Sequence, residues 1–449
     1  MYALVDVNNM YVSCERAFNP RLDARPVVVL SSNDGACIAR SNEAKELGVK
    51  MAQPWFQVRQ LVKTHRLIAL SANFELYADM SGRMMSIASR YTPVCIPYSI
   101  DEAFLDFDGI PGDLTHISRH LRATVLQELG LPTSVGLANT KTLAKLANHV
   151  AKTCDRKPAH YPAALSKRLA QVCNFSELEP HDLQALMQLT DVGDVWGVGR
   201  KIVEKLRDRG VKSVLDLVRA DPASLRREFS VVFEKTVLEL RGQPCLSLED
   251  APAAKQQILV SRSFGRPVTD VESIVEAVSE FASRAAEKLR QQGSVAGAIQ
   301  VFISTSPFRA NDRQHSPSLT VPLQATADTR HLVSAATRAV REIFRSSHKY
   351  TKAGAMLLDL RDRASLDQQK ELDLFAPESG SAAQAESKDR SALMEAMDKL
   401  NQRFGRGAVR IGSSTSAKAN DACTAAWAVR QDRRSPRYTT RWDEMPVVR

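Results

Sequence analysis

Three carboxylates from two separate segments are the residues of this chain best suited to chemistry. Asp6 ends a short apolar run, and Asp101 and Glu102 interrupt an apolar stretch from Tyr98 to Leu105. Like charges held close together destabilise a fold unless a cation lies between them. Oxygen-only ligands favour Mg²⁺ or Mn²⁺ over zinc. Because two such ions about 4 Å apart catalyse in-line phosphoryl transfer, this set predicts a metal-dependent nucleotidyltransferase acting on nucleic acid.

Each carboxylate also has a plainer interpretation. Asp6 alone is at least as well explained as a turn residue, and Asp101 and Glu102 equally well as exposed loop acids. Adjacent residues on a regular strand point to opposite faces, so both reach one metal only at a tight turn or bulge. The apolar surroundings favour the metal site, because solvated loops are rarely so apolar.

Basic residues on two helices are candidates for binding a triphosphate. Lys45 follows Arg40 on a short helix, and Lys141 and Lys145 lie four residues apart on one face of a later helix. The later pair follows a helix start, where free backbone N–H groups also attract phosphate. Lys145 is the better candidate, although solvated helix surface is the ordinary place for most lysines.

Tyr11 lies just past the strand that ends at Asp6. A ring there could pack under a bound sugar and exclude a 2′-hydroxyl, the group that distinguishes RNA from DNA. On spacing alone, a core tyrosine is the more probable interpretation.

The turn Trp196-Gly197-Val198-Gly199 resembles a helix-hairpin-helix connection. Its glycines let a backbone approach closely, so that N–H groups at the next helix start can bind a phosphate without reading sequence. An ordinary glycine-rich connection between helices explains the turn equally well.

Size and charge limit the class of protein. The 449 residues predict three to four domains, and the apolar content of 44% predicts that most of them fold. A net charge of +10 suits nucleic acid better than a membrane. Seven scattered cysteines without CxxC spacing argue against disulfides and zinc. With no signal peptide or long apolar run, we expect a cytoplasmic protein.

Local patterns divide the chain into segments. Residues 1–165 alternate strands with helices and predict an α/β or α+β catalytic unit, with 16–70 as an inserted subdomain. The expected strands are 2–7, 27–30 and 133–137, the expected helices are 41–47, 115–129 and 140–153, and a hairpin is expected at 96–107. Residues 166–245 are expected to be wholly helical.

The later part of the chain predicts a βαββαβ unit of the split-βαβ type. Its expected elements are strand 257–264, helix 271–291, strand 295–304, strand 318–323, helix 328–346 and strand 351–359. Beyond about 363 the chain is a polar stretch with a flexible linker at 379–383 and a basic end.

A series of blocks along the chain carries a family resemblance. These blocks are 6–11, 32–40, 43–50, 77–81, 98–104, 140–145, 194–200, 261–265 and 435–441. In this order they resemble Y-family DNA polymerases, and closely the UmuC-type catalytic subunits, over nearly the whole length.

The resemblance implies an α+β multidomain fold, the right hand of a polymerase. It has a ferredoxin-like palm, small fingers, a helix-hairpin-helix thumb, a βαββαβ little finger and a C-terminal tail. The implied boundaries are 1–15 and 71–165 for the palm, 16–70 for the fingers, 166–245 for the thumb, 255–360 for the little finger and 363–449 for the tail.

The resemblance also implies roles for single residues. Asp6, Asp101 and Glu102, with the Val7 carbonyl, would hold two Mg²⁺ ions, with Mn²⁺ as the alternative, and Tyr11 would exclude ribonucleotides. The triphosphate would lie against Lys45, Lys145, Arg40 and the backbone near Asn9 and Met10. DNA would contact Gly197, Gly199, Arg200 and Arg262, and a sliding clamp would contact Leu372, Leu374 and Phe375.

The implied function is error-prone translesion synthesis on primer–template DNA with deoxynucleoside triphosphates, in the SOS response. Implied partners are a processed UmuD dimer, RecA and the sliding clamp, with no membrane contact. The end segment 435–441 is a candidate contact for UmuD or RecA, although a basic tail that binds DNA explains it equally well.

Two positions depart from the family pattern. Asn42 stands where many members carry a tyrosine that contacts the triphosphate, and UmuC-type chains share this replacement of the tyrosine. Glu371 stands in place of a glutamine in the clamp-binding peptide. For this chain the resemblance therefore implies no direct hydroxyl contact with the triphosphate. Clamp binding is still expected, because the apolar anchors remain, but it is expected to be weaker than with glutamine.

Two other functions compete with the polymerase. A non-catalytic scaffold that occupies stalled primer ends would need the basic DNA-binding regions but not the carboxylates. A nucleotide cyclase on a similar palm would not need the helical segment or the clamp-like peptide. Both are therefore disfavoured.

Overall fold

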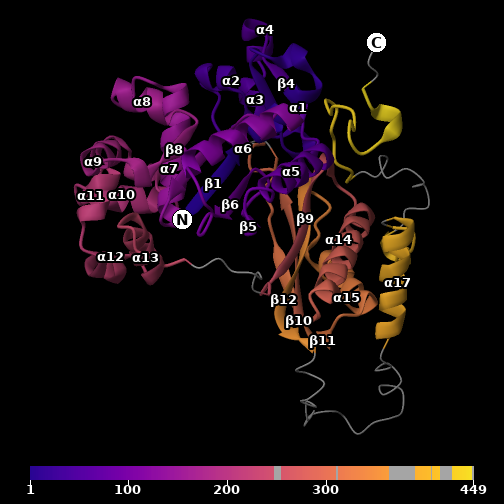
Figure 1. Ribbon diagram of the computed structural model, residues 1–449. Coiled ribbons are helices and arrows are strands. Elements are labelled where there is room, and N and C mark those ends of the chain that lie inside the picture. The colour runs from indigo at the N-terminus through magenta and orange to yellow at the C-terminus, as the bar shows by residue number, and fades with distance from the viewer. Residues whose placement is uncertain (247–253, 310–311, 364–389, 406, 415–426, 447–449) are drawn as a thin grey trace. The chain divides into compact units, whose positions relative to one another are not determined.

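The computed structural model describes residues 1–246, 254–309, 312–363, 390–405, 407–414 and 427–446 (Figure 1). The chain forms two compact units, each with its own core. The first unit comprises Met1–Ser31, Gly35–Asp250 and Asp432–Arg449, and the second comprises Ser32–Asp34 and Ala251–Gln431. The C-terminal segment therefore belongs to the unit that contains the N-terminus.

The first unit is built on a mixed five-stranded sheet. In spatial order its strands are β5 (Cys95–Pro97), β6 (Glu102–Asp106), β1 (Tyr2–Val7), β7 (Thr133–Ala138) and β8 (Val172–Asn174). β1 runs antiparallel to both neighbours, and β8 runs parallel to β7. The predicted strands 2–7 and 133–137 and the predicted hairpin 96–107 are confirmed.

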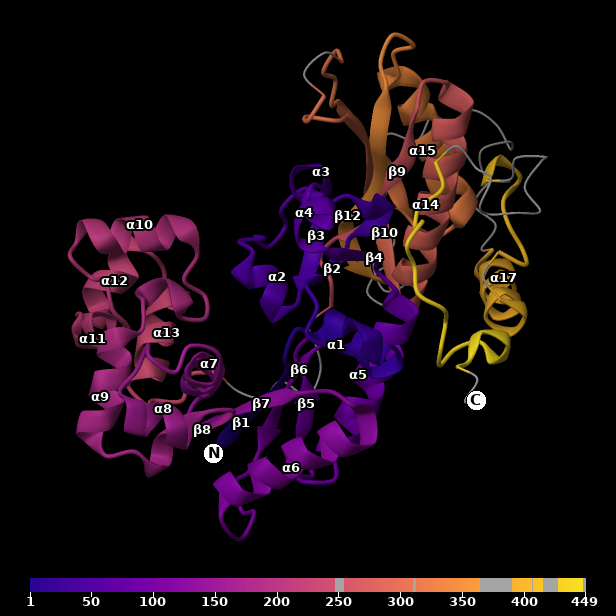
Figure 2. The same cartoon turned by 90° about the horizontal axis from the view of Figure 1, so that it is seen from above.

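Helices cover both faces of this sheet (Figure 2). They are α1 (Met10–Phe18), α5 (Phe74–Ala88), α6 (Leu114–Leu129) and α7 (Lys141–Arg156). Because side chains alternate along a strand, Val5 and Val7 pack with α5 and α6, whereas Leu4 packs with α7. The predicted helices 115–129 and 140–153 are confirmed, and Gly130 ends the former at a φ of 68°.

α7 lies unusually close to the sheet, because Gly136 of β7 carries no side chain. A Cβ at Gly136 would overlap the backbone of Ala144 and Asn148. The buried Asn148 then binds two strands at once, since its Nδ2 donates to the carbonyls of Ser134 at 2.8 Å and Leu4 at 3.3 Å. This contact fixes α7 relative to β1.

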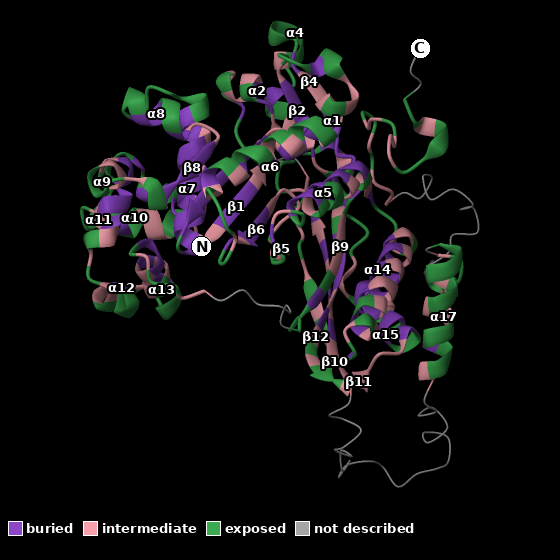
Figure 3. Cartoon of the chain, in the orientation of Figure 1, coloured by how far each residue is buried: buried purple, intermediate pink, exposed green. Residues whose placement is uncertain are grey.

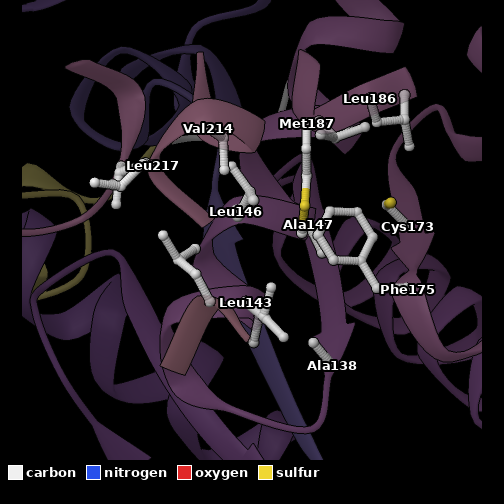
Figure 4. Packing of buried hydrophobic residues seen from close by; sticks show 14 of the residues in the cluster. Ala138, Leu143, Leu146, Ala147, Cys173, Phe175, Leu186, Met187, Val214 and Leu217 are labelled. Carbon is white, nitrogen blue, oxygen red and sulfur yellow. The ribbon is translucent and has the colours of Figure 1, made fainter. Parts of the chain in front are cut away.

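The other face of α7 packs into a helical region. Figure 4 shows side chains of α7 among those of the helices that follow: Leu143, Leu146, Ala147, Leu186, Met187, Val214 and Leu217. α7 is therefore held by apolar burial on one side and by the sheet on the other.

A smaller sheet of three strands follows α1. Its order is β3 (Cys37–Arg40), β2 (Val27–Leu30) and β4 (Ile68–Ser71), with helices α2 (Asn42–Glu46), α3 (Trp55–Val58) and α4 (Leu61–His65) around it. β2 is buried at every residue, which confirms the predicted strand 27–30. Ser41 caps α2, since its Oγ accepts from the Ala44 N–H at 3.2 Å.

The segment after α7 is mostly helical. It contains α8 (Ala163–Leu169), α9 (Pro180–Leu189), α10 (Arg200–Asp208), α11 (Val214–Arg219), α12 (Pro222–Glu228) and α13 (Val231–Leu240). The expectation that 166–245 is wholly helical is wrong, because the three residues of β8 join the sheet edge beside β7. A strand this short leaves no periodic signal, and its burial comes from the sheet it joins.

The second unit is a four-stranded antiparallel sheet covered by two helices. Its elements are β9 (Ile258–Val268), α14 (Val271–Gln291), β10 (Ser294–Thr305), β11 (Ser318–Thr326), α15 (Thr329–Ile343) and β12 (Tyr350–Asp362), in the spatial order β11-β10-β12-β9. The predicted βαββαβ order is confirmed. Figure 3 shows that α14 and α15 each bury one face and expose the other.

A further helix, α17 (Ser391–Phe404), lies in the stretch beyond 363 that was expected to be only polar and partly a linker. It packs on α14 through an ion pair in which Arg290 Nε lies 2.7 Å from Asp398 Oδ2. The linker expected at 379–383 lies outside the described residues. No helix in the described ranges combines the length and apolarity that a membrane span requires.

The contact at Gly136 gives a prediction for stability. Gly136→Ala should lower the free energy of unfolding by at least about 2 kcal/mol, because the new methyl group overpacks the backbone of α7. Gly82→Ala is the matched control: Gly82 lies in α5 with no atom near a Cβ, so alanine should stabilise by about 0.5–1 kcal/mol. Thermal unfolding of the full chain measures both, and equal effects would contradict the packing argument.

Candidate active site

The register of the central sheet brings two of the carboxylates together. Asp6, near the end of β1, is the cross-strand partner of Glu102, the first residue of β6. Directly opposite residues in an antiparallel pair share a face, and this face is the one that Leu4 presents to α7. Asp6 and Glu102 therefore both lie on the α7 side of the sheet.

Asp101 reaches the same end of the sheet from a tight turn. The N–H groups of Tyr98 and Ser99 both donate to the Glu102 carbonyl, at 3.0 and 3.1 Å. Asp101 lies within this turn, and its carbonyl accepts from the Val7 N–H at 2.8 Å. The turn supplies the irregular geometry that adjacent carboxylates need in order to serve one site.

Each carboxylate has a partner within the chain. Lys152 Nζ lies 2.6 Å from Asp6 Oδ1, and Lys145 Nζ lies 3.0 Å from Glu102 Oε1. The Ser99 hydroxyl donates to Asp101 Oδ1 at 2.5 Å. Within the described residues, no three His, Cys, Asp or Glu side chains are arranged to hold a metal ion as they stand. Two ammonium groups balance the acidic cluster instead.

Burial makes the charge of Asp6 costly. It raises the pKa of Asp6 to about 6, while Lys152 lowers it and the negative charges of Asp101 and Glu102 raise it. The three carboxylates are thus close enough to repel one another. A hard divalent cation fits this donor set, because every donor is an oxygen and the site already requires positive charge.

A cavity of about 310 Å³ opens beside the carboxylates. It is lined by Asp6, Val7, Asn9, Met10, Tyr11, Ile38, Ala39, Arg40, Lys45, Met51, Ile100, Asp101 and Lys152. Eight of the residues predicted from sequence meet here, although β1, β3, α2 and the turn before β6 are far apart in the chain. Glu102 and Lys145, which pair with each other, are not among the lining residues.

A second cavity, of about 260 Å³, shares several of these residues and is rich in cations. Lys45, Lys152 and Arg156 line it together with Asn8, Asn9, Asn42 and Asp155. The pKa of Lys45 is lowered to about 8 by burial and by the nearby charges of Arg156, Arg40 and Lys152. Cations held this close together favour the binding of a polyanion.

Sequence reasoning missed Lys152 and Arg156. A signal for them existed, because Lys145, Lys152 and Arg156 are spaced by seven and four residues and therefore share a face of α7. Only the lysines in the first two turns of this helix, Lys141 and Lys145, were predicted to bind phosphate.

Polar contacts hold the start of α1 against α2. Asn9, the residue before α1, has a φ of 51°, a conformation that asparagine adopts more readily than most residues. Its side chain accepts from Lys45 Nζ at 2.5 Å and donates to Asn42 Oδ1 at 3.1 Å. Asn42, the position that departs from the family pattern, thus supports Asn9 at the cavity wall.

Tyr11 forms part of an aromatic layer at the cavity. Its ring stacks on Tyr77, with centroids 4.4 Å apart and planes at 13°, and meets Phe74 edge-on at 6.0 Å. Tyr77 is fully buried, and its hydroxyl donates to Glu15 Oε1 at 2.7 Å. The layer gives Tyr11 a rigid support.

Lys145 is held by aromatic rings as well as by Glu102. Its Nζ lies 4.2 Å from the ring centroid of Tyr98 and 4.7 Å from that of Trp196. Trp196 begins the turn that resembles a helix-hairpin-helix. In that turn Gly197 has a φ of 87°, and Gly199 is the residue before Arg200 and α10.

The remaining predicted contacts lie elsewhere. Arg262, on β9 of the second unit, packs its guanidinium over the rings of Phe281 and Trp427, at 5.9 and 5.6 Å. Its contact with DNA stays a prediction. The clamp-binding residues Leu372, Leu374 and Phe375 lie outside the described residues.

Comparison with known families covers most of the chain. Residues 5–149 match the impB/mucB/samB family, and 255–374 match the C-terminal domain of that family. Residues 391–448 match a domain of unknown function. The first match contains the whole carboxylate cluster.

Individual relatives agree with these matches. The chain is 42% identical to protein UmuC of Salmonella typhimurium, over 100% of both chains, and 41% identical to protein MucB of Salmonella typhimurium, over 100% of this chain and 99% of that one. DNA polymerase IV 1 of Bacillus subtilis is 25% identical, over 91% of this chain and 92% of that protein.

Among solved structures, a Y-family DNA polymerase chimera of Dbh and Dpo4 matches with a TM-score of 0.62 and 18% identity, over 80% of this chain and 98% of that chain. This likeness establishes the right-hand polymerase fold. Together with the full-length identity to UmuC, it shows that the chain belongs to the impB/mucB/samB family of UmuC-type Y-family DNA polymerases and is a DNA-directed DNA polymerase of error-prone translesion synthesis.

Proposed function

We propose that the chain extends a primer 3′ end opposite damaged template, with Asp6, Asp101 and Glu102 holding two Mg²⁺ ions. The observation that carries this proposal is the pairing of Asp6 with Glu102 across β1 and β6, next to a cavity with a cationic wall. Enzymes of this family use divalent metal ions. The identity and number of the ions are the finer part of the proposal, and they rest on the oxygen-only donor set.

The bound ions would activate the primer 3′-hydroxyl and neutralise the charge that develops on the leaving pyrophosphate. The chain's own residues prepare the site for them. Asp6 is paired with Lys152, and Glu102 is paired with Lys145. These two carboxylates would hold the cations in place of the ammonium groups.

Lys152, once released from Asp6, faces the same cavity as Lys45 and Arg40. We infer that these cations, with Arg156, hold the triphosphate of the incoming deoxynucleotide. Arg40 is suited to this role, because its NH1 group is fixed by the Val49 carbonyl at 2.8 Å while its buried Nε has no hydrogen-bond partner within the described residues.

Tyr11 is proposed as the gate against ribonucleotides. Its ring lines the cavity beside Met10 and Asp101 and rests on Tyr77. A rigid ring at this position would leave no space for a 2′-hydroxyl. Gly197, Gly199 and Arg200, at the start of α10, are proposed to hold the DNA backbone.

Partners are proposed from the family resemblance: a processed UmuD dimer, RecA and the sliding clamp, in the cytoplasm. The alternative of a non-catalytic scaffold is disfavoured, because a scaffold would gain nothing from the cost of burying Asp6 among other carboxylates.

Primer extension on undamaged and abasic templates, with and without activated RecA and processed UmuD, tests the function. Tight DNA binding without extension under every condition would favour the scaffold.

Removal of a carboxylate should separate chemistry from DNA binding. Asp101→Ala should reduce nucleotide incorporation below detection, while primer–template affinity stays within a few-fold of the unchanged protein, because DNA is held by the basic surface. Asp79→Ala, an acid on α5 paired with Arg83, is the matched control and should keep full activity. Undiminished incorporation by the Asp101 variant would refute the metal assignment.

The raised pKa of Asp6 predicts how metal binding depends on pH. Because its pKa of about 6 exceeds the ordinary 3.8, ionisation of Asp6 destabilises the metal-free fold as pH rises through 6, and a bound cation relieves this cost. Below pH 6 the metal must displace a proton, so Mg²⁺ affinity should fall about tenfold per pH unit.

Thermal unfolding at fixed Mg²⁺ concentration measures this effect. The stabilisation by Mg²⁺ should be larger near pH 7.5 than near pH 5 and should vanish in Asp6→Asn, whereas Asp79→Asn should behave as the unchanged protein. An equal stabilisation at both pH values would contradict the prediction.

The gate can be tested by removing its ring. Tyr11→Ala should raise the ratio of ribonucleotide to deoxynucleotide incorporation by at least about tenfold, since the space for the 2′-hydroxyl is then open. Tyr11→Phe keeps the ring and should keep the discrimination. Single-nucleotide incorporation kinetics give both ratios, and an unchanged ratio in Tyr11→Ala would exclude Tyr11 as the gate.

A further inference from the structure

The C-terminal segment 432–446, defined here as the tail segment, belongs to the compact unit that contains the active site. It is the yellow stretch near the C-terminus in Figure 1, and it contacts α1, α5 and β4. Its sequence lies within the domain of unknown function. The sequence analysis considered part of it only as a contact for partners or DNA.

The tail segment extends the small sheet at its open edge. Arg434 bridges Ser71, the last residue of β4, in parallel register. The Ser71 N–H donates to the Arg433 carbonyl at 3.1 Å, and the Arg433 N–H donates to Ser71 Oγ at 3.0 Å. Ser71 is fully buried, so these bonds belong to the interior of the unit.

The start of α5 then holds the tail segment by a buried side chain. Asn73, 1% exposed, caps α5 with its Oδ1, while its Nδ2 donates to Ser435 Oγ at 3.0 Å and to the Pro436 carbonyl at 3.0 Å. Further along, the Tyr438 ring stacks on Phe18 of α1, with centroids 4.9 Å apart and planes at 7°. The docking is therefore specific as well as close.

The decisive contact is at Glu15, a carboxylate on α1 that is only 1% exposed. Its Oε1 accepts two hydrogen bonds, from the Tyr77 hydroxyl at 2.7 Å and from the Ser435 hydroxyl at 3.0 Å. A buried carboxylate is stable only when its oxygens are satisfied. Ser435 therefore donates one of the two hydrogen bonds that Glu15 Oε1 accepts.

Glu15 in turn fixes the support of the proposed gate. Its bond to Tyr77 orients the ring on which Tyr11 stacks. We propose that the tail segment, through Ser435 and Glu15, positions Tyr77 and Tyr11 and so sets the discrimination between ribonucleotides and deoxynucleotides. This inference rests on the proposed role of Tyr11, and Ser435 acts as a positioning residue.

Substitutions at the two residues that donate to Glu15, Ser435 and Tyr77, test this proposal in the full-length chain. Ser435→Ala removes the hydroxyl on the tail side, and Tyr77→Phe removes the hydroxyl on the palm side while keeping the stacked ring. Each should raise the ratio of ribonucleotide to deoxynucleotide incorporation by up to about tenfold, because a displacement of the ring by a fraction of 1 Å should cost less than the roughly hundredfold loss that a full 1 Å can cause.

Two matched variants should leave the ratio unchanged. Ser435→Thr retains the hydroxyl, and Trp442→Ala changes a residue of the tail segment that is 91% exposed. A general loss of stability would lower the incorporation of both nucleotides and leave their ratio constant, so the ratio isolates positioning from folding.

The outcomes separate this inference from the proposed gate. If Tyr11→Ala raises the ratio but Ser435→Ala and Tyr77→Phe do not, the role of the tail segment is overturned and the gate stands. If Tyr11→Ala leaves the ratio unchanged, the gate is refuted and the inference falls with it. If Ser435→Ala does not fold, Asn73→Ser tests the tail side instead, because it keeps a capping oxygen for α5 but removes the Nδ2 that donates to Ser435 Oγ and to the Pro436 carbonyl. An unchanged ratio in Asn73→Ser would then overturn the role of the tail segment.

Discussion

The close packing of α7 against the central sheet is the constraint on which the active site depends. The missing side chain of Gly136 lets the helix backbone approach β7, and Asn148 ties the helix to two strands. This contact sets the distance between the carboxylates on β1 and β6 and the lysines on α7. The chemistry therefore depends on a purely structural glycine that touches no substrate.

The electrostatics of the site follow from that packing. Three acids in a partly buried position repel one another, and Lys152 and Lys145 balance two of them directly. The two ammonium groups offset the repulsion between the acids and so stabilise the fold. A metal ion that neutralised the acids instead would leave Lys152 free to bind the triphosphate, as proposed above. The metal ions proposed above would take the places of these ammonium groups beside Asp6 and Glu102.

The aromatic layer beneath Tyr11 shows a comparable dependence on distant parts of the chain. Tyr77 is held by Glu15, and Glu15 is satisfied partly by Ser435, some 420 residues away in sequence. A segment assigned only to a domain of unknown function is thus part of the interior of the catalytic unit. The docking of this segment and the orientation of the Tyr77 ring beneath Tyr11 are therefore physically linked.

The sequence by itself determined the main strands and helices and the βαββαβ unit, because these depend on periodicity, and short blocks of local sequence were enough to single out the three carboxylates as candidates. The tertiary structure decided the rest. Neither β8 nor the pairing of Lys152 with Asp6 can be predicted from the local sequence, because each depends on a partner far along the chain. The same holds for Ser435, whose hydroxyl acquires its role only when the tail segment folds back onto Glu15.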